Sequence, residues 1–326
     1  MIARTAYADL PSALVDELAA AGLDPRAVYD HVVLAFEEDL PGGVDDVTSD
    51  AMPDMGEAVA DFAAREPGVV AGLAIAELAF VYALGDTVKV TGRVPDGTRV
   101  APGDVVLTVS GPVRGVLTAE RTALNFASHL SGVATATSRW VDALAGTRAR
   151  VLDTRKTLPG WRALQKYAVR CGGGVNHRFS LVDRAMVKDN HAVAAGGVVA
   201  AYEAVVARHP GLRVEVEVMD LDELRAVLAA GCTEVLLDNM STADMAEAVA
   251  INRAAGGHAT LEASGGLTLE RAREVAETGV DFISVGALTH SVIVFDLGLD
   301  FRPHGGSAPV DPRLEGSAPQ TPRAGG

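Results

Sequence analysis

The chain has 326 residues, enough for two domains or for one barrel with additions, and 48% of them are hydrophobic. Its formal net charge of −15 argues against general nucleic-acid binding, because such binding needs a basic face. Two cysteines without C-x-x-C spacing argue against a disulfide framework and a structural zinc site. The chain shows neither a signal-peptide pattern nor an apolar run of about 18 to 20 residues, so we expect a cytoplasmic protein with no nucleic-acid or membrane partner.

The first 145 residues predict helices around a small sheet. Residues 10–23 carry an approximately helical apolar stripe that ends near Gly22. Residues 37–56 are acidic and rich in turn formers, which predicts a loop. Residues 57–113 alternate short β-like runs with Gly, Pro and Asp, which predicts a small sheet. Residues 114–145 contain no proline and predict one or two helices.

The second half of the chain repeats the order strand, helix, glycine, strand, which indicates βα units and a parallel sheet. In residues 214–218 valine and glutamate strictly alternate, although a parallel strand covered on both faces should be apolar throughout. One face must therefore look into a polar interior, which favours a barrel over an open doubly wound sheet. The β-like runs are residues 151–153, 185–188, 214–218, 235–237, 260–263 and 282–285.

Polar residues and glycines recur at the end of each of these runs. In a βα barrel such positions are the carboxyl ends of the strands, where active sites are assembled. Ordinary polar turns are the alternative, but they would not supply this many charged residues. The positions are Thr154, Arg155 and Lys156, then Lys188, Glu217 and Asp238, then Ser264, Gly265 and Gly266, and finally Val285, Gly286 and Ala287.

Lysines and arginines are concentrated in residues 151–191, which suggests a pocket for anions in an otherwise acidic chain. Arg155 and Arg178 can bind carboxylates in bidentate pairs, while Lys156 and Lys188 act as point charges. The alternative for these cations is a solvated charged loop. The glycine-containing ends of the last two strands are typical of phosphate-binding loops, with plain turns as the alternative.

Histidines and acidic residues complete the candidate site. His177 lies beside an arginine in a glycine-rich segment and is interpreted as a hydrogen-bond donor to an anion. The pair Glu217 and Asp238 can hold ribose hydroxyls or a magnesium-bound polyphosphate, but it is too sparse for a full protein cage around the metal. We therefore expect no metal site made by the protein alone, and Mg²⁺ arriving with the substrate. The other histidines considered are interpreted as structural: His129, His191 and His290.

Eight segments stand in order between about residue 30 and residue 302: EDLPGGVDDVTSD, GVLTAERTALNFASHLSGVAT, LDTRKTLPGWRALQKYAVRCGGGVNHR, KDNH, VEVEV, LLDNMS, LEASGGLTLE and ISVGALTHS. Each segment alone is a weak signal, but the ordered set is highly specific. The set resembles the nicotinate-nucleotide pyrophosphorylase family, also called quinolinate phosphoribosyltransferase (decarboxylating).

The resemblance implies an α/β fold with two domains. An N-terminal α/β sandwich is expected at residues 1–131, with residues 291–302 packing back on it, and an incomplete TIM-like βα barrel with the active site at residues 132–290. The resemblance also implies a homodimer, or a higher oligomer, in which the N-terminal domain of one subunit covers the barrel mouth of the other. Residues 303–326 are rich in Pro, Gly and Ala and are predicted to be a disordered tail.

The implied reaction joins quinolinate and phosphoribosyl pyrophosphate to give nicotinate mononucleotide, pyrophosphate and CO2 in de novo NAD biosynthesis. By resemblance, the quinolinate carboxylates are bound by Arg155, His177, Arg178 and Lys188, with Arg121 contributed by the other subunit. Phosphoribosyl pyrophosphate is held by Lys156, Glu217 and Asp238, which are also the expected catalytic residues, and by the loops at 264–266 and 285–287. The remaining cations of the segment are predicted to be surface or interface charges: Arg162, Lys166 and Arg170.

Three other interpretations remain open. The nearest is a paralogue of the same fold associated with molybdenum transport loci. A non-catalytic barrel that senses a phosphorylated metabolite would not need both a dicarboxylate cluster and a pyrophosphate side. An aldolase-like barrel with Lys156 or Lys188 as a Schiff base requires a lysine among apolar neighbours, and both of these lie among charges.

Overall fold

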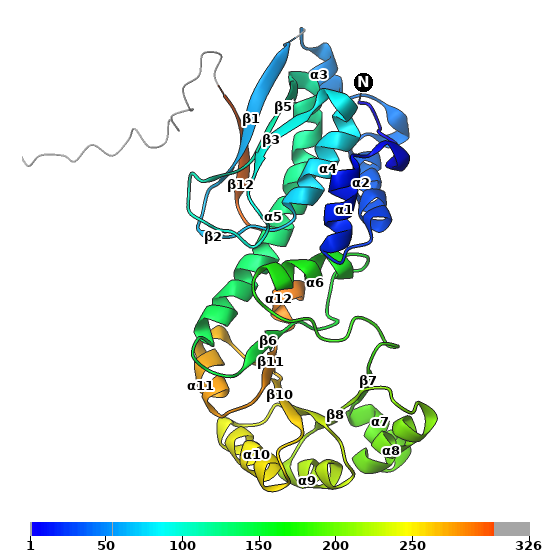
Figure 1. The fold of residues 1–326 in the computed structure, drawn as a ribbon, viewed down its shortest axis with the longest axis vertical. Helices are drawn as coiled ribbons and strands as arrows, with labels where there is room; N and C mark the ends of the chain where they lie inside the picture. The colour runs from blue at the N-terminus through cyan, green and yellow to red at the C-terminus, as the bar shows by residue number, and fades with distance from the viewer. Residues whose placement is uncertain (1, 54, 303–326) are drawn as a thin grey trace, which may run out of the picture.

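The computed structural model describes residues 2–53 and 55–302, and these residues form two parts joined by one long helix (Figure 1). The predicted disordered tail at residues 303–326 lies outside the described residues. No helix within the described part of the chain is both long enough and apolar enough to cross a membrane.

The upper part in Figure 1 is built on an antiparallel sheet with the strand order β12-β1-β5-β3. Its edge strand β12 comes from the far end of the chain and pairs with β1, so that Leu299 lies opposite Phe62. On its other edge β1 pairs with β5, where Leu107 lies opposite Phe62. The strands are β1 (Glu57–Ala64), β3 (Lys89–Arg93), β5 (Val105–Pro112) and β12 (Leu297–Phe301), with a separate small ladder of β2 (Gly68–Val69) and β4 (Arg99–Val100).

Helices cover this sheet, and one of them corrects the sequence prediction. Residues 57–113 were expected to form only a sheet, but α4 (Leu73–Leu84) interrupts the strands and buries every residue except Glu77. A short run that is apolar on all sides has no periodicity, so sequence alone cannot separate a buried helix from a strand. The predicted loop at 37–56 also contains structure, because Asp46 caps α3 (Val47–Ala51) by accepting from the backbone of Thr48 at 2.9 Å. The other helices of this part are α1 (Ser12–Ala20) and α2 (Pro25–Asp39).

Helix α5 (Val113–Ala143) joins the two parts. It is a single uninterrupted helix of 31 residues, which at 1.5 Å per residue spans about 46 Å. Its first half packs against α4 and the sheet, and its second half packs against α6 (Arg162–Cys171) and β6 (Arg150–Leu152). The helix therefore fixes the position of the barrel relative to the N-terminal sheet.

The lower part contains a parallel sheet with the order β6-β11-β10-β9-β8-β7, which includes all six predicted strands. A further parallel bridge joins Leu152 to Val175, but within the described residues no ladder connects Val175 to β7. The strands thus form an incomplete TIM-like barrel, as expected. The strands besides β6 are β7 (Ala185–Val187), β8 (Val214–Val218), β9 (Glu234–Asp238), β10 (Thr260–Ser264) and β11 (Phe282–Ser284).

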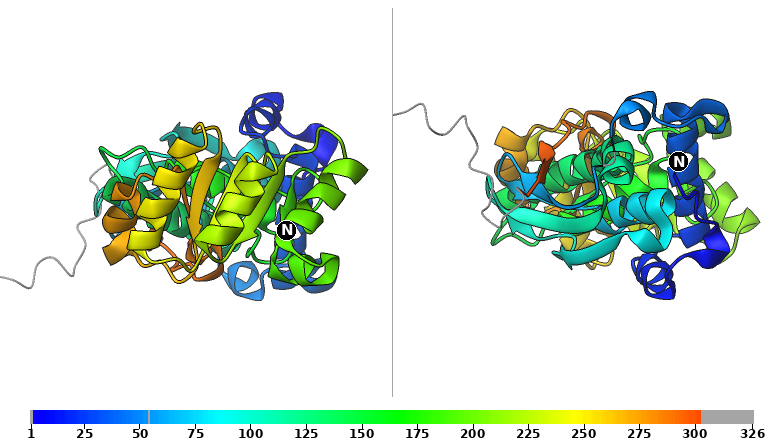
Figure 2. Two further views of the ribbon diagram at one scale, coloured as in Figure 1. Left: turned by 90° about the horizontal axis from the view of Figure 1, so that it is seen from below. Right: turned by 90° about the horizontal axis from the view of Figure 1, so that it is seen from above.

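Helices follow the strands and cover their outer face, as the view from below shows (Figure 2). Helix α9 begins at Asp220, whose side chain accepts from the backbone of Asp222 at 2.9 Å and of Glu223 at 2.8 Å. Glu223 in turn accepts from the backbone N–H of Met219 at 2.8 Å, so both ends of this first turn are capped by side chains. The helices are α7 (Asp189–Ala195), α8 (Val198–Arg208), α9 (Leu221–Ala229), α10 (Thr242–Ala254), α11 (Ala272–Glu277) and α12 (Ala287–His290), with 3₁₀ turns at Tyr7–Asp9, Pro41–Gly43, Gly85–Thr87 and Leu269–Arg271.

Candidate active site

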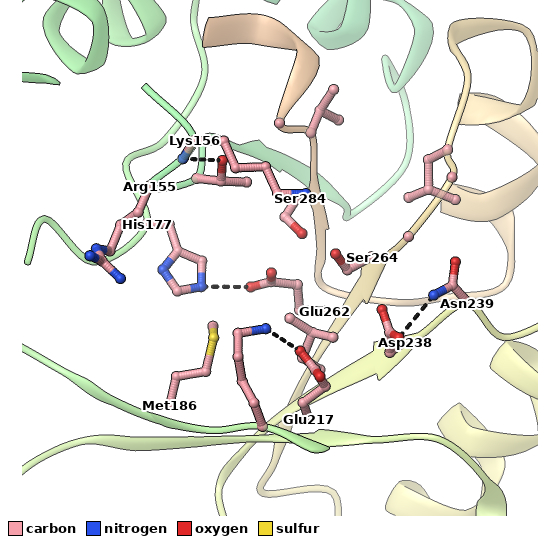
Figure 3. Close-up of a pocket in the computed structure, with 18 of the residues that line it drawn as sticks. Arg155, Lys156, His177, Met186, Glu217, Asp238, Asn239, Glu262, Ser264 and Ser284 are labelled. Carbon is pink, nitrogen blue, oxygen red and sulfur yellow. Dashed lines mark hydrogen bonds and ion pairs between the residues drawn. The ribbon is translucent and has the colours of Figure 1, made fainter. Parts of the chain in front are cut away.

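The carboxyl ends of the barrel strands surround a cavity of about 680 Å³ (Figure 3). Every predicted site residue except Arg121 lines it, although these residues are spread from 154 to 287 in the sequence. Parallel strands in one barrel bring their carboxyl ends to one edge, which explains the convergence. The cavity is also lined by residues that were not predicted as site residues: Met186, Leu236, Asn239, Glu262, Leu267, Ser284 and His290.

A buried ion pair between Asp153 and Lys166 organises one wall of this cavity. The two side chains are 0% and 1% exposed, and Lys166 also donates to the carbonyl of His177 at 3.0 Å. Asp153 accepts in addition from the backbone N–H of His177 at 2.8 Å and from Asn176 at 2.6 Å. Burial raises the pKa of Asp153 and lowers the pKa of Lys166, and each partner opposes the shift of the other. The pair ties the end of β6 to α6 and to residues 175–177.

The prediction that Lys166 is a surface or interface charge is therefore wrong. It lies on the inner face of α6, whereas Arg170 on the same helix is exposed and donates to the carbonyl of Ala21. Arg162 is half-buried and donates to Thr157 and to the carbonyl of Phe179. The charges of Arg162, Lys166 and Arg170 could not show which of them is buried. That depends on which side chain of α6 faces Asp153.

Arg155 and Arg178 present uncompensated positive charge to the cavity. Among the described residues neither forms an ion pair with a carboxylate, and the Nε atom of Arg155 is buried without a hydrogen-bond partner. Burial and then the charge of Arg155 lower the pKa of Arg178, which is the signature of two cations held close together. A guanidinium pair of this kind favours a bound anion. The side chain of Lys156 is exposed beside them and lies against Gly286.

Lys188 and Glu217 form an ion pair across the ends of β7 and β8. The family resemblance implies that Lys188 belongs with the quinolinate cations and Glu217 with the phosphoribosyl ligands. The structure brings the two groups together, so Lys188 lies at the junction of the two predicted subsites.

His177 is held on both ring nitrogens by the protein itself. Its Nδ1 atom accepts from the backbone N–H of Arg178 at 2.6 Å, so Nε2 carries the proton and donates to Glu215 at 2.9 Å. Glu215 is one of the two glutamates of the alternating β8 strand and is 1% exposed, which confirms that this strand faces a polar interior. His177 thus fixes the backbone at Arg178 and is already paired where it was interpreted as a donor to an anion.

Glycine is required at one point of the cavity rim, and a second glycine is closely packed there. A side chain at Gly265 would meet Asn239 at 2.3 Å, and the residue has a φ of +92°, which strains any side-chain-bearing residue. A Cβ at Gly286 would lie 3.0 Å from the Lys156 side chain and 3.1 Å from the ring of His290. Asn239 itself adopts a left-handed φ of 54° and donates to Asp238 at 2.9 Å. The backbone at both rims is therefore open to close approach by a ligand.

Three buried side chains have the spacing of metal ligands. One atom each from His177, Glu215 and Glu262 lies within 4.8 Å of the others. The donor set does not suit a cation, however, because Arg184 already holds Glu215 at 2.9 Å and His177 donates its proton to the same carboxylate. We interpret the three as a hydrogen-bonded cluster of the barrel interior.

Arg121 lies apart from the cavity. It is exposed on α5 and does not line the cavity of its own chain. Glu120 precedes it and is half-buried, and burial raises the pKa of its carboxyl.

Comparison with known proteins identifies the family. Residues 46–131 match the quinolinate phosphoribosyl transferase N-terminal domain, and residues 133–300 match the C-terminal domain of the same enzyme. The chain belongs to the quinolinate phosphoribosyltransferase family.

Individual relatives of this family cover most of the chain. A nicotinate-nucleotide pyrophosphorylase [carboxylating] from Mycobacterium leprae is 50% identical over 275 residues, which are 84% of this chain and 97% of the relative. A quinolinate phosphoribosyltransferase [decarboxylating] from Nicotiana glauca is 40% identical, covering 82% of this chain and 80% of the relative. The solved nicotinate-nucleotide pyrophosphorylase from Francisella tularensis has a TM-score of 0.80 and 39% identity, covering 85% of this chain and 96% of that one.

Two of the lining residues that were missed carried a signal in the sequence. Glu262 stands in the run Leu-Glu-Ala, an apolar strand with one acidic residue, which is the pattern that marked Glu215 and Glu217 on β8. His290 was interpreted as structural, but it follows the predicted phosphate loop by three residues and lines the cavity. Met186, Leu236 and Leu267 have no such signal, because apolar strand residues look alike whether they face a cavity or a core.

We predict that Lys166→Met destabilises the fold by about 3 to 5 kcal/mol, because it leaves the Asp153 carboxylate buried without its cation. Lys89→Met is the matched control, since Lys89 is exposed, and should change stability by no more than about 0.5 kcal/mol. The measurement is the free energy of unfolding in urea. Equal effects of the two substitutions would show that the ion pair does not organise this wall.

Proposed function

We propose that the protein converts quinolinate and phosphoribosyl pyrophosphate to nicotinate mononucleotide, pyrophosphate and CO2, as a decarboxylating pentosyltransferase of de novo NAD biosynthesis. The observation that supports the proposal is that one cavity has a cationic side and a side lined by carboxylates and glycine loops. Uncompensated guanidiniums from Arg155 and Arg178 lie on one side, and carboxylates at Glu217 and Asp238 with open glycine loops lie on the other. A dicarboxylate fits the first side, and a sugar with phosphates fits the second.

In the proposed complex, Arg155 and Arg178 hold the two carboxylates of quinolinate, with Lys188 at the inner edge. The unpartnered Nε of Arg155 supports this assignment, because a buried donor without an acceptor is costly unless a ligand completes it. His177 supports the site indirectly by holding the backbone of Arg178. Thr154 contributes by accepting the backbone N–H of Lys156 at 3.0 Å, which shapes the turn after β6.

Phosphoribosyl pyrophosphate is proposed to bind across the ends of β8 to β11. Glu217 and Asp238 face the ribose, Lys156 faces the pyrophosphate, and the rims at Ser264–Gly266 and Val285–Ala287 offer backbone N–H groups to the phosphates. Mg²⁺ is proposed to arrive with this substrate and to neutralise its phosphate charge. Carboxylates at strand ends beside a polyphosphate fit such an ion, and Asp238 and Glu217 are the residues that would contact it.

The chemistry follows from charge development. As pyrophosphate leaves, positive charge develops at the ribose and is stabilised by Glu217 or Asp238, while Lys156 neutralises the departing group. The ribosylated ring nitrogen is cationic, and it stabilises the electron pair that remains on carbon 2 when the adjacent carboxylate departs as CO2. The protein therefore acts mainly by positioning the two substrates.

We also propose that the protein works as a homodimer or as a higher oligomer built from such dimers. We propose two domains, at residues 1–131 plus 291–302 and at residues 132–290. In this arrangement Arg121 of one subunit completes the quinolinate site of the other. The exposed position of Arg121, away from the cavity of its own chain, supports this role. We place the enzyme in the cytoplasm.

The alternatives fit the cavity less well. The pair of arginines favours quinolinate over the substrate of a molybdenum-locus paralogue. A metabolite sensor would not need both the arginine pair and the residues proposed to bind pyrophosphate. A Schiff-base lysine requires an apolar environment, but Lys188 is paired with Glu217 and Lys156 is exposed.

The direct test is to incubate the protein with quinolinate, phosphoribosyl pyrophosphate and Mg²⁺ and to measure nicotinate mononucleotide. We expect product formation with quinolinate and none with nicotinic acid. No product from quinolinate, with nicotinic acid accepted in its place, would overturn the proposal.

Arg155→Ala should raise the KM for quinolinate roughly 10- to 100-fold, because it removes charge-assisted hydrogen bonds, and should leave the KM for phosphoribosyl pyrophosphate nearly unchanged. Arg170→Ala is the matched control, because Arg170 is exposed and outside the cavity. Steady-state kinetics with each substrate varied in turn provide the measurement. Equal loss of affinity for both substrates would contradict the division of the cavity.

Mixing Arg121→Ala with Arg155→Ala protein tests the shared site. At quinolinate concentrations well below the wild-type KM, each variant alone should have about a tenth of wild-type activity or less. In a two-fold dimer formed after subunit exchange, one site of each heterodimer has both arginines intact, so an equal mixture should regain about a quarter of wild-type activity. Failure to regain activity, when subunit exchange is verified by mass, would place Arg121 outside the partner's site.

A further inference from the structure

Glu262 lies on the boundary between two cavities. It extends from β10 into the barrel interior, lines the cavity described above, and also lines a second cavity of about 460 Å³. This rear cavity lies toward the amino ends of the strands and is bordered by Arg184, Arg213, Glu234, His258 and Phe282. In Figure 3 the Glu262 carboxyl points to the middle of the site, between His177 and Ser284.

Glu262 is buried without a cation of its own. It is 3% exposed, and neither carboxyl oxygen has a hydrogen-bond partner among the described residues. The nearby positive groups are directed to Glu215 instead, which Arg184 contacts at 2.9 Å and His177 at 2.9 Å. Glu262 lies farther from His177, with 3.5 Å between Oε2 and Nε2. Arg184 is shared further with Glu234.

These surroundings keep Glu262 in its protonated form. Burial, and then the charge of Glu215, raise the pKa of Glu262 well above that of an ordinary glutamate, while the nearby Ser284 hydroxyl and the charge of Arg184 lower it only in part. Burial also opposes ionisation of Glu215, but the hydrogen bond from His177 and the charge of Arg184 outweigh it and lower the pKa of that carboxyl. The interior thus pairs an ionised Glu215 with a neutral, proton-carrying Glu262.

The proposed reaction consumes a proton that the groups assigned so far do not supply. When CO2 leaves the ribosylated ring, the electron pair of the broken bond stays on carbon 2, and this carbon must gain a proton to give nicotinate mononucleotide. Glu217 is held by Lys188, and Lys156 lies on the pyrophosphate side. Glu262 lies 3.5 Å from His177. The ring of His177 accepts a hydrogen bond from the backbone N–H of Arg178, which is proposed to bind quinolinate.

We propose that Glu262 donates the proton that replaces the departing carboxylate of quinolinate, and that it regains a proton from solvent through the rear cavity. The inference rests on the proposed function. In this step the C–CO2 bond breaks, the O–H bond of Glu262 breaks, and a C–H bond forms at carbon 2. Glu262 is left as a carboxylate, and a proton from bulk water restores the acid. The rear cavity allows this while substrates and the partner subunit cover the front of the site.

A single-turnover experiment with Glu262→Gln separates the two chemical steps. Glutamine keeps the size of the side chain but cannot act as an acid. Pyrophosphate release should proceed within a few-fold of the wild-type rate, whereas nicotinate mononucleotide should form about 100-fold more slowly, the usual contribution of a general acid. Ribosylated quinolinate that retains both carboxylates should accumulate, because the carbanion recaptures CO2 before it is protonated. Quenched samples are assayed for pyrophosphate, CO2 and both nucleotides.

Controls make the outcome decisive. Glu234→Gln removes another buried glutamate that borders only the rear cavity, so both products should still form in step. If Glu262→Gln slows both steps equally, or neither, Glu262 is not the proton donor. If wild-type protein makes pyrophosphate and nicotinate mononucleotide in no condition, the proposed function itself fails, which is a different result.

The pH dependence of the wild-type protein gives a second test that does not depend on the folding of a variant. The donor acts in its protonated form, so the second step should slow relative to pyrophosphate release as pH rises, and ribosylated quinolinate should appear at high pH. Formation of the two products in step at every pH at which the protein stays folded would overturn the proposal.

Discussion

The geometry of the site depends on the buried pair of Asp153 and Lys166. A carboxylate at the end of β6 would be costly to bury alone, so the lysine from α6 and the amide groups of residues 176 and 177 must converge on it. That convergence places Arg155 and Lys156 directly after Asp153 and places His177 and Arg178 opposite them. The buried Lys166 therefore helps to position Arg155 and Arg178, which face the cavity, although Lys166 does not line the cavity itself.

The polar interior is organised as two layers of charge. At the carboxyl ends of the strands, the guanidiniums of Arg155 and Arg178 lack carboxylate partners among the described residues. One layer below, carboxylates are in excess and compete for Arg184 and His177. The upper layer can attract anions despite the chain's net charge of −15, because the field of a cleft is set by its own lining. In the lower layer, burial and the charge of Glu215 raise the pKa of Glu262.

Much of the fold follows from local patterns in the sequence. The β-branched runs of the second half become β6 to β11, and the alternation of valine and glutamate in β8 correctly indicates a polar interior. Residues placed after strands reach one cavity because parallel strands share an edge. Prediction failed where the local sequence pattern fits more than one structure. Helix α4 is apolar on all sides, so its sequence also fits a buried strand. Helix α3 depends on the cap at Asp46, within a stretch rich in turn-forming residues.

The sequence by itself determined the family, the barrel and the list of charged groups at the strand ends, because these depend on residue type and order along the chain. Only the tertiary structure decided which charges find partners. It buried Lys166 against Asp153, joined Lys188 to Glu217, held His177 between Arg178 and Glu215, and left Glu262 without a cation. The three pairs Asp153–Lys166, Lys188–Glu217 and His177–Glu215 join residues 13, 29 and 38 positions apart. The energy of each pair depends on its burial and on the distance between its atoms, and the order of residues along the chain gives neither.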